Sequence, residues 1–211
     1  MITPVLEPKR EPPTGVGLTV GDTPRAYEAA PRRRGRRIPP AQLSHELRLE
    51  RDPDLQRRRW LVGLSFVGAA LGKVVSLYQM GIIRRLPDLP SKYFDATKVD
   101  ASDYAYKRMQ TPDALLMVAS YATTAILAGA GGRDRAETNP ALPILMAAKT
   151  VADASIALQL GREEWKENKA LCGYCQAATL VSLASVALAL PEALRAFRRI
   201  ESPELPGPVP L

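Results

Sequence analysis

The stretch "WLVGLSFVGAALGKVVSLYQMGII", Trp60 to Ile83, decides the fold, because it holds one charged residue, Lys73, in 24 positions. As an α-helix rising about 1.5 Å per residue, it reaches roughly 36 Å. The hydrocarbon core of a bilayer is about 30 Å thick, so this helix is long enough to cross it. Small side chains, which let membrane helices approach closely, recur along it at Gly63, Gly68 and Gly72.

Three more apolar runs follow, at residues 113–131, 141–160 and 171–190, and each is close to the roughly 20 residues that a membrane span requires. We therefore expect an all-α fold, a polytopic membrane four-helix bundle with its first span at 60–83, in a domain of residues 60–199. The alternative is a soluble, alanine-rich helical bundle in which the same apolar side chains form a core.

The N-terminal residues 1–40 are rich in proline and carry the basic run "RRRGRR" at 32–37. With few large apolar side chains to bury, this arm is predicted to be disordered. Its basic run suits the anionic face of a membrane, which we favour, or a nucleic acid. Residues 41–59 predict a short polar helix with Ser44 as its N-cap and a basic juxtamembrane segment, and residues 200–211 form a proline-rich tail.

Basic residues at the ends of the runs predict the orientation of the chain in the membrane. The segments "QRRRW" before the first run, "GGRDRAETN" between the second and third, and "LRAFRRI" after the fourth all flank one side of the bilayer. The positive-inside rule makes that side cytoplasmic, so both termini are expected there, in a bacterial inner membrane. The loop 84–112 and the turn "GREEWKENKA" then lie outside, although the loop carries charges of both signs.

The two cysteines of the chain, Cys172 and Cys175, open the fourth run in "LCGYCQAATL". A structural zinc site needs four ligands and a catalytic one usually three. Two cysteines and a single histidine, His45, predicted on the opposite side of the membrane, do not supply them, so no metal is expected. The same ligand count excludes an iron–sulfur site, unless a second copy of the chain supplies the missing ligands.

A redox pair fits the cysteines better. Residues at i and i+3 in the first turn of a helix share a face, and the unpaired N–H groups there favour a thiolate at the more N-terminal sulfur. Cys172 is then the more reactive thiol, at the extracytoplasmic end of the helix, where disulfides persist. The alternative is that two small side chains simply pack in an alanine-rich helix.

Four membrane helices with Cys-x-x-Cys opening the last one resemble the vitamin K epoxide reductase family, in particular its bacterial quinone-linked, disulfide-forming branch. The stretch "TKVDASDYAYKRMQTPDALLMVASY", Thr97 to Tyr121, is similar to the family's outer loop and second helix. The resemblance covers about residues 60–199 and leaves the N-terminal arm unexplained.

The resemblance implies a membrane thiol:quinone oxidoreductase that supports extracytoplasmic disulfide formation. Its partners would be membrane lipid, a quinone (ubiquinone or menaquinone) and a thioredoxin-like thiol donor protein, with no specific nucleic acid. Cys175 would face the quinone, and Cys172 would exchange disulfides with the donor. Thr179, one turn beyond Cys175, and Asp113, at the start of the second helix, are candidates for contact with the quinone oxygens, although both positions also suit ordinary helix packing.

The chain departs from the family in its outer loop, where members hold a second cysteine pair. Aligning on Val99 and Ser102 puts Ala96 at the position of the second loop cysteine, and the loop contains no cysteine at all. A donor would then reach Cys172 directly or through a separate small redox protein. The rival function is a non-catalytic membrane subunit or scaffold that retains the bundle.

Charged residues inside the runs are costly in a bilayer and indicate pairing or function. Lys149 and Asp153 are spaced i to i+4 in the third run, which favours an ion pair on one helical face, with Lys73 facing the bundle or snorkelling. A proton path that serves quinone chemistry is the alternative.

Overall fold

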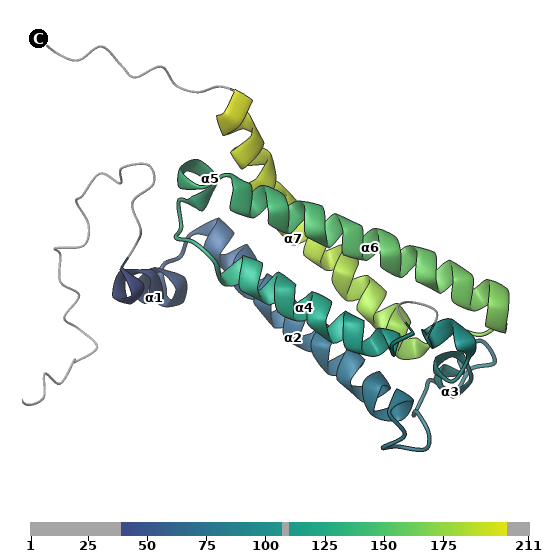
Figure 1. Cartoon of the computed structure of the whole chain (residues 1–211). Coiled ribbons are helices and arrows are strands. Elements are labelled where there is room, and N and C mark those ends of the chain that lie inside the picture. Colours follow the sequence, from purple (N-terminus) through teal and green to yellow (C-terminus); the bar gives the residue numbers. More distant parts are fainter. Residues whose placement is uncertain (1–38, 107–109, 202–211) are drawn as a thin grey trace, which may run out of the picture. The chain divides into compact units, whose positions relative to one another are not determined.

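The computed structural model describes residues 39–106 and 110–201, all within one compact unit of residues 34–211. Four long helices run side by side in it (Figure 1): α2 (Pro53–Gln79), α4 (Asp113–Gly129), α6 (Ala141–Asn168) and α7 (Gly173–Glu201). The predicted all-α bundle of four apolar helices is confirmed. The predicted basic arm and proline-rich tail, apart from residues 39–40 and 200–201, lie outside the described residues.

Three of the helices extend beyond the predicted spans. Helix α2 begins at Pro53, because the Asp52 side chain accepts hydrogen bonds from the first N–H groups of the helix, at 2.8 and 3.2 Å. Helix α6 continues through its charged end to Asn168, and α7 runs past Leu190 to Glu201. A charge ends an apolar run, but it does not interrupt the backbone hydrogen bonds of a helix, so hydropathy alone sets these boundaries too short.

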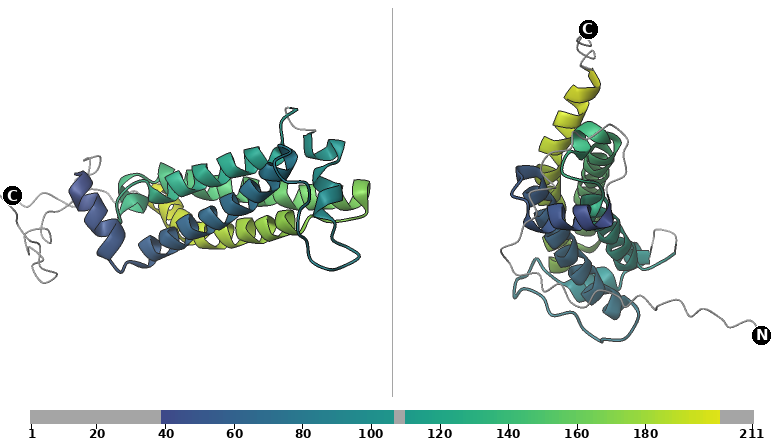
Figure 2. Two further views of the ribbon diagram at one scale, coloured as in Figure 1. Left: turned by 90° about the horizontal axis from the view of Figure 1, so that it is seen from below. Right: turned by 90° about the vertical axis from the view of Figure 1, so that its left-hand side faces the viewer.

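Short helices lie at the two ends of the bundle. Helices α1 (Pro40–Leu49) and α5 (Arg135–Thr138) are at one end, and α3 (Ala96–Asp100) and the 3₁₀ helix η2 (Asp103–Tyr106) are at the other (Figures 1 and 2). The prediction of Ser44 as an N-cap is wrong, because α1 already begins at Pro40, whose fixed φ suits the first turn. His45 is exposed on α1.

The outer surface of the helices is apolar. Phe66, Ile126 and Leu180 are 68%, 70% and 69% exposed, whereas a soluble bundle would bury such side chains. Helices α2, α6 and α7 are long and apolar enough to cross a membrane, and α4 is an apolar helix of 17 residues. The chain is an integral membrane protein.

Helix α2 packs against α4 and α7, and α6 packs against α7. The α2–α4 contact depends on Gly68 and Gly72, since a Cβ at Gly68 would overlap the ring of Tyr121, and one at Gly72 would crowd Met117. Gly63 faces open space and takes no part in this contact. The close approach seats the Tyr121 ring in the bundle, where it forms one wall of the cavity described below.

Two buried arginines link neighbouring segments at the end of the bundle near α1 and α5. Arg58 donates hydrogen bonds to the carbonyl oxygens of residues 128 and 130–132, which follow or end α4. The Nε and Nη2 atoms of Arg135 each lie 2.7 Å from a carboxylate oxygen of Glu192 on α7. Both arginines belong to the basic segments that suggested the cytoplasmic side, but each is buried and used for structure.

Candidate functional site

The outer loop, residues 80–112, is attached to the short segment that joins α6 to α7. The N–H of Leu171 donates to the carbonyl oxygen of Tyr93 at 2.9 Å, and the N–H of Asp95 donates to the carbonyl oxygen of Leu171 at 3.0 Å. Lys98 adds a bond from its Nζ to the carbonyl oxygen of Asn168 at 2.8 Å. The loop therefore lies directly against the segment that leads into the cysteine pair.

Cys172 precedes the first residue of α7, and Cys175 lies in its first turn. The N–H of Cys175 donates to Cys172 Sγ at 3.2 Å, and no disulfide joins the two sulfurs. Cys172 Sγ thus occupies the position of a helix N-cap. The hydrogen bond from Cys175 lowers the pKa of the Cys172 thiol, but burial and the charge of Asp100 raise it, and the net direction is upward. The thiolate that a helix N-terminus favours by itself is therefore not the favoured form of Cys172 in the folded protein.

The two sulfurs differ in what they face. Cys172 is fully buried, and it packs with Leu86, Ala96 and Val99 of the outer loop. Cys175 lines a cavity of about 280 Å³ between α4, α6 and α7. The pair therefore connects the underside of the outer loop with the interior of the bundle.

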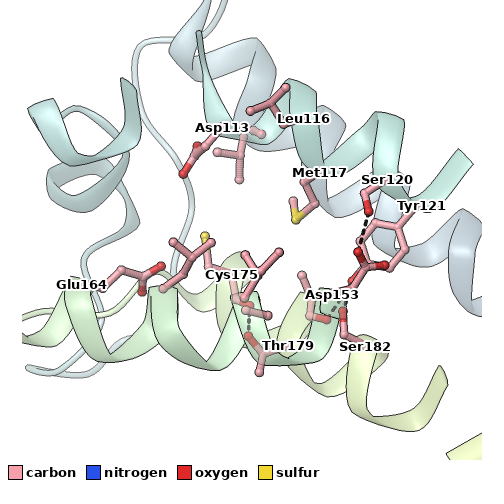
Figure 3. A pocket seen from close by; sticks show the side chains of 16 residues that line it. Asp113, Leu116, Met117, Ser120, Tyr121, Asp153, Glu164, Cys175, Thr179 and Ser182 are labelled. Atoms are coloured by element: carbon pink, nitrogen blue, oxygen red, sulfur yellow. Dashed lines mark hydrogen bonds between the residues drawn. The ribbon is translucent and has the colours of Figure 1, made fainter. Parts of the chain in front are cut away.

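Apolar side chains form most of the cavity wall, and polar groups gather at its two ends (Figure 3). Met117 of α4 and Leu160 of α6 are among the apolar ones. Asp113, Glu164, Cys175 and Thr179 lie toward the end with the cysteines. This combination of an apolar chamber with a few polar groups is typical of sites for small apolar ligands.

The two candidate quinone contacts from the sequence, Thr179 and Asp113, both line this cavity. The Thr179 hydroxyl donates to the carbonyl oxygen of Cys175 at 2.9 Å, which leaves its oxygen able to accept. Asp113 accepts a bond of 2.8 Å from the side-chain amide of Gln79. Both side chains are thereby held at the cavity by neighbours within the bundle.

The opposite end of the cavity carries an ion pair. Lys149 pairs with Asp153, as the favoured interpretation of their spacing has it, and also donates to the Ser120 and Thr124 hydroxyls at 2.8 and 2.6 Å. Asp153 and Ser120 line the cavity. Lys73, in contrast, is exposed on α2 and does not face the bundle.

A comparison with models of protein families matches residues 59–190 to the vitamin K epoxide reductase family. The chain belongs to this family. Members are typically oxidoreductases, and the match covers α4 and α6 entirely, most of α2 and α7, the outer loop and both cysteines. Comparisons with curated proteins and with solved structures gave no match.

Ala96 lies where the vitamin K epoxide reductase resemblance predicts a loop cysteine. It is fully buried and belongs to the same apolar cluster as Cys172. The Asp88 side chain holds it there by accepting its N–H at 2.6 Å. A methyl group thus takes the place beside Cys172 where the family pattern has a thiol.

Two buried carboxyl groups flank the cysteine pair, and the sequence reasoning missed both. Asp100 of α3 has a carboxylate oxygen within 4.8 Å of both Cys172 Sγ and Cys175 Sγ. Glu164 of α6 accepts a hydrogen bond of 3.2 Å from the N–H of Cys172. In the sequence, Asp100 is only one of several charged residues in the loop, and Glu164 lies beyond the predicted end of its span. Neither residue belongs to a local motif that would mark it as functional.

The carboxyl group of Asp100 has an altered acidity. Burial raises its pKa to about 7, and the charges of Asp113, Glu164 and Asp88 act in the same direction, whereas the hydrogen bond from Cys172 lowers it. At neutral pH the group is therefore close to half protonated, and it can either accept or return a proton.

Asp100, Cys172 and Cys175 bring three groups of the kind that ligate metals within 4.8 Å of one another. The count of possible metal ligands made from the sequence includes only cysteine and histidine, and not aspartate. A structural zinc site takes four ligands, and this cluster offers three.

We expect Gly173→Ala to loosen the outer loop over Cys172, because the added Cβ would overlap Oδ1 of Asp88. Overpacking of this kind costs about 1–3 kcal/mol, which corresponds to a roughly 10- to 100-fold rise in transient exposure. The measurement is the rate at which maleimide modifies Cys172 in a Cys175→Ser background, read by mass spectrometry. Gly63→Ala is the control, since a Cβ there meets no neighbour, and equal rates in both variants would contradict the prediction.

Proposed function

We propose that the protein is a membrane thiol:quinone oxidoreductase in which the Cys172–Cys175 pair passes electrons from a partner's thiols to a quinone in the bundle cavity. The observation that carries the proposal is the unequal placement of the two sulfurs. Cys175 opens into the cavity, and Cys172 lies under the outer loop, 3.2 Å from the backbone nitrogen of Cys175. One pair of thiols can therefore serve two reactants on different sides.

The residues present fit a quinone. The cavity volume of about 280 Å³ is close to the lower end of the roughly 300–1,000 Å³ of small-molecule sites. Its wall suits a flat apolar ring, with Thr179 and Asp113 placed to contact the ring oxygens. When bound, ubiquinone or menaquinone supplies an acceptor for two electrons and two protons.

The cysteine end of the bundle would be extracytoplasmic, in a bacterial inner membrane. It lies opposite α1 and α5 (Figure 1), and the exposed arginines Arg59, Arg195 and Arg198 belong to the α1 and α5 end. The positive-inside rule supports a cytoplasmic location for that end. A thioredoxin-like donor would then reach the pair from the compartment in which disulfides persist.

The donor's access to Cys172 requires movement of the outer loop. Thiol–disulfide exchange needs an attacking thiolate to approach the sulfur directly, and Cys172 has no exposed surface in the described structure. Together with Ala96 in place of a loop cysteine, this closure is the observation that favours the rival proposal of a non-catalytic scaffold. Oxidation of thiols by a quinone in the wild-type protein distinguishes the oxidoreductase from the non-catalytic scaffold.

The test uses the full chain, reduced and reconstituted in lipid nanodiscs, with ubiquinone or menaquinone as oxidant. We expect Cys172 and Cys175 to become oxidised to a disulfide, measured by thiol trapping, while an equal amount of quinol forms, measured by its absorbance. Absence of oxidation with both quinones would remove the catalytic proposal and leave the scaffold.

A further inference from the structure

Each thiol of the pair has a buried carboxyl group of its own. Asp100 is 2% exposed and has a carboxylate oxygen within 4.8 Å of Cys172 Sγ, and Glu164 is 2% exposed and its charge acts on Cys175. Glu164 lines the cavity, but Asp100 lies on the side of the outer loop. Glu164 is further held by the N–H of Cys172 and by the side-chain amide of Gln176, each at 3.2 Å.

Asp100 is less well satisfied than Glu164. Within the described part of the chain, its Oδ2 atom is buried without a hydrogen-bond partner. Burying an unsatisfied carboxylate oxygen is costly, and a proton on that oxygen relieves the cost. Among the described residues, the titratable groups that act on Asp100 are all acidic, namely Tyr78, Asp88, Asp113, Glu164, Cys172 and Cys175.

We propose that Asp100 is the proton acceptor and donor for Cys172. This inference rests on the proposed function and adds a catalytic residue to it. A buried carboxyl group within 4.8 Å of a thiol sulfur, with an unused oxygen and no cation among the described groups that act on it, is suited to exchanging that thiol's proton.

The proton balance closes over one cycle. When the reduced pair is oxidised, Cys172 gives its proton to Asp100, the resulting thiolate forms the S–S bond with Cys175, and two electrons leave to the quinone. When the donor's two thiols reduce the pair, the Cys172 thiolate is released and takes the proton back from Asp100. The Cys175 thiolate, which is released first when the donor attacks Cys172, takes a proton from water by way of Glu164. The donor loses two protons to water, and the quinol gains two, of which one comes from Cys175 by way of Glu164 and the other from water.

The test needs no quinone. In a Cys175→Ser background Cys172 is the chain's one thiol, and its reaction with dithiodipyridine forms a mixed disulfide and releases one thiopyridone, which is followed by absorbance between pH 6 and pH 9. We expect Asp100→Asn to slow this reaction at neutral pH by about 100-fold, the lower end of general-base effects. Its pH profile should lose the step that the Asp100 carboxyl group contributes near neutral pH, because no carboxylate remains to take the proton.

Two variants separate a proton-transfer role from a structural one. Asp100→Glu keeps the carboxyl group but enlarges a buried side chain, and we expect it to react within about 10-fold of the parent. Asp103→Asn makes the same chemical change on an exposed carboxyl group of the same loop and should have no effect. The proposal is overturned if Asp100→Asn reacts like the parent, or if Asp100→Glu is as slow as Asp100→Asn. If quinone does not oxidise the cysteine pair of the wild-type protein, that result contradicts the proposed function and not the role of Asp100.

Discussion

Replacing Cys175 by serine is expected to abolish quinone-dependent oxidation of thiols. Serine has nearly the same shape, but it cannot form a disulfide with Cys172. Because Cys175 is the one thiol among the residues that line the cavity, no other group of the pair can pass electrons to a quinone. The measurement is quinol formation in nanodiscs with a dithiol as electron source.

Two further variants sharpen this prediction. Cys172→Ser should also remove turnover, but only the Cys175→Ser protein should accumulate a mixed disulfide with the donor, since Cys172 is the proposed exchanging sulfur. Ser155→Ala, an exposed position on α6 whose hydroxyl bonds only within its helix, should leave activity unchanged. Quinol formation by Cys175→Ser at the wild-type rate would show that electrons bypass the pair.

The second large effect is expected for Glu192→Ala, which should destabilise the bundle by about 3–5 kcal/mol. Arg135 has no exposed side-chain surface, and the substitution would leave its charge buried without the carboxylate. Removing one partner of a buried ion pair has effects of this size, because the remaining charge is neither hydrated nor paired. Arg135 would keep its bonds to the carbonyl oxygens of Leu127 and Ala130, so the fold should weaken rather than fail.

Stability is measured as the midpoint temperature of thermal unfolding in detergent, and unfolding is detected by the aggregation of the unfolded protein. Glu137→Ala, an exposed glutamate on α5 near the same arginine, is the matched control and should change the midpoint little. Glu192→Gln, which keeps hydrogen-bonding capacity without charge, should fall between the two. Equal midpoints for Glu192→Ala and Glu137→Ala would show that the buried pair adds nothing to stability.

The sequence identified the parts of this molecule that depend on local composition. Four apolar runs of about bilayer length predicted the all-α membrane bundle, because crossing hydrocarbon requires a continuous apolar helix and this requirement is written along the chain. The spacing of Cys172 and Cys175 at a helix start likewise predicted their proximity. Lys149 and Asp153, four residues apart on one helix, are a third feature of this local kind.

Only the tertiary structure decided how the site is assembled. Asp100 and Glu164 are 64 residues apart in sequence, and no periodicity or spacing connects them, yet helix packing and the pairing of the outer loop with Leu171 put one beside each thiol. The same holds for Arg135 and Glu192, whose contact depends on the meeting of α5 and α7. Which side chains share a buried space is determined by close packing between distant segments, so the sequence alone showed a pair of thiols but not the acids that surround it.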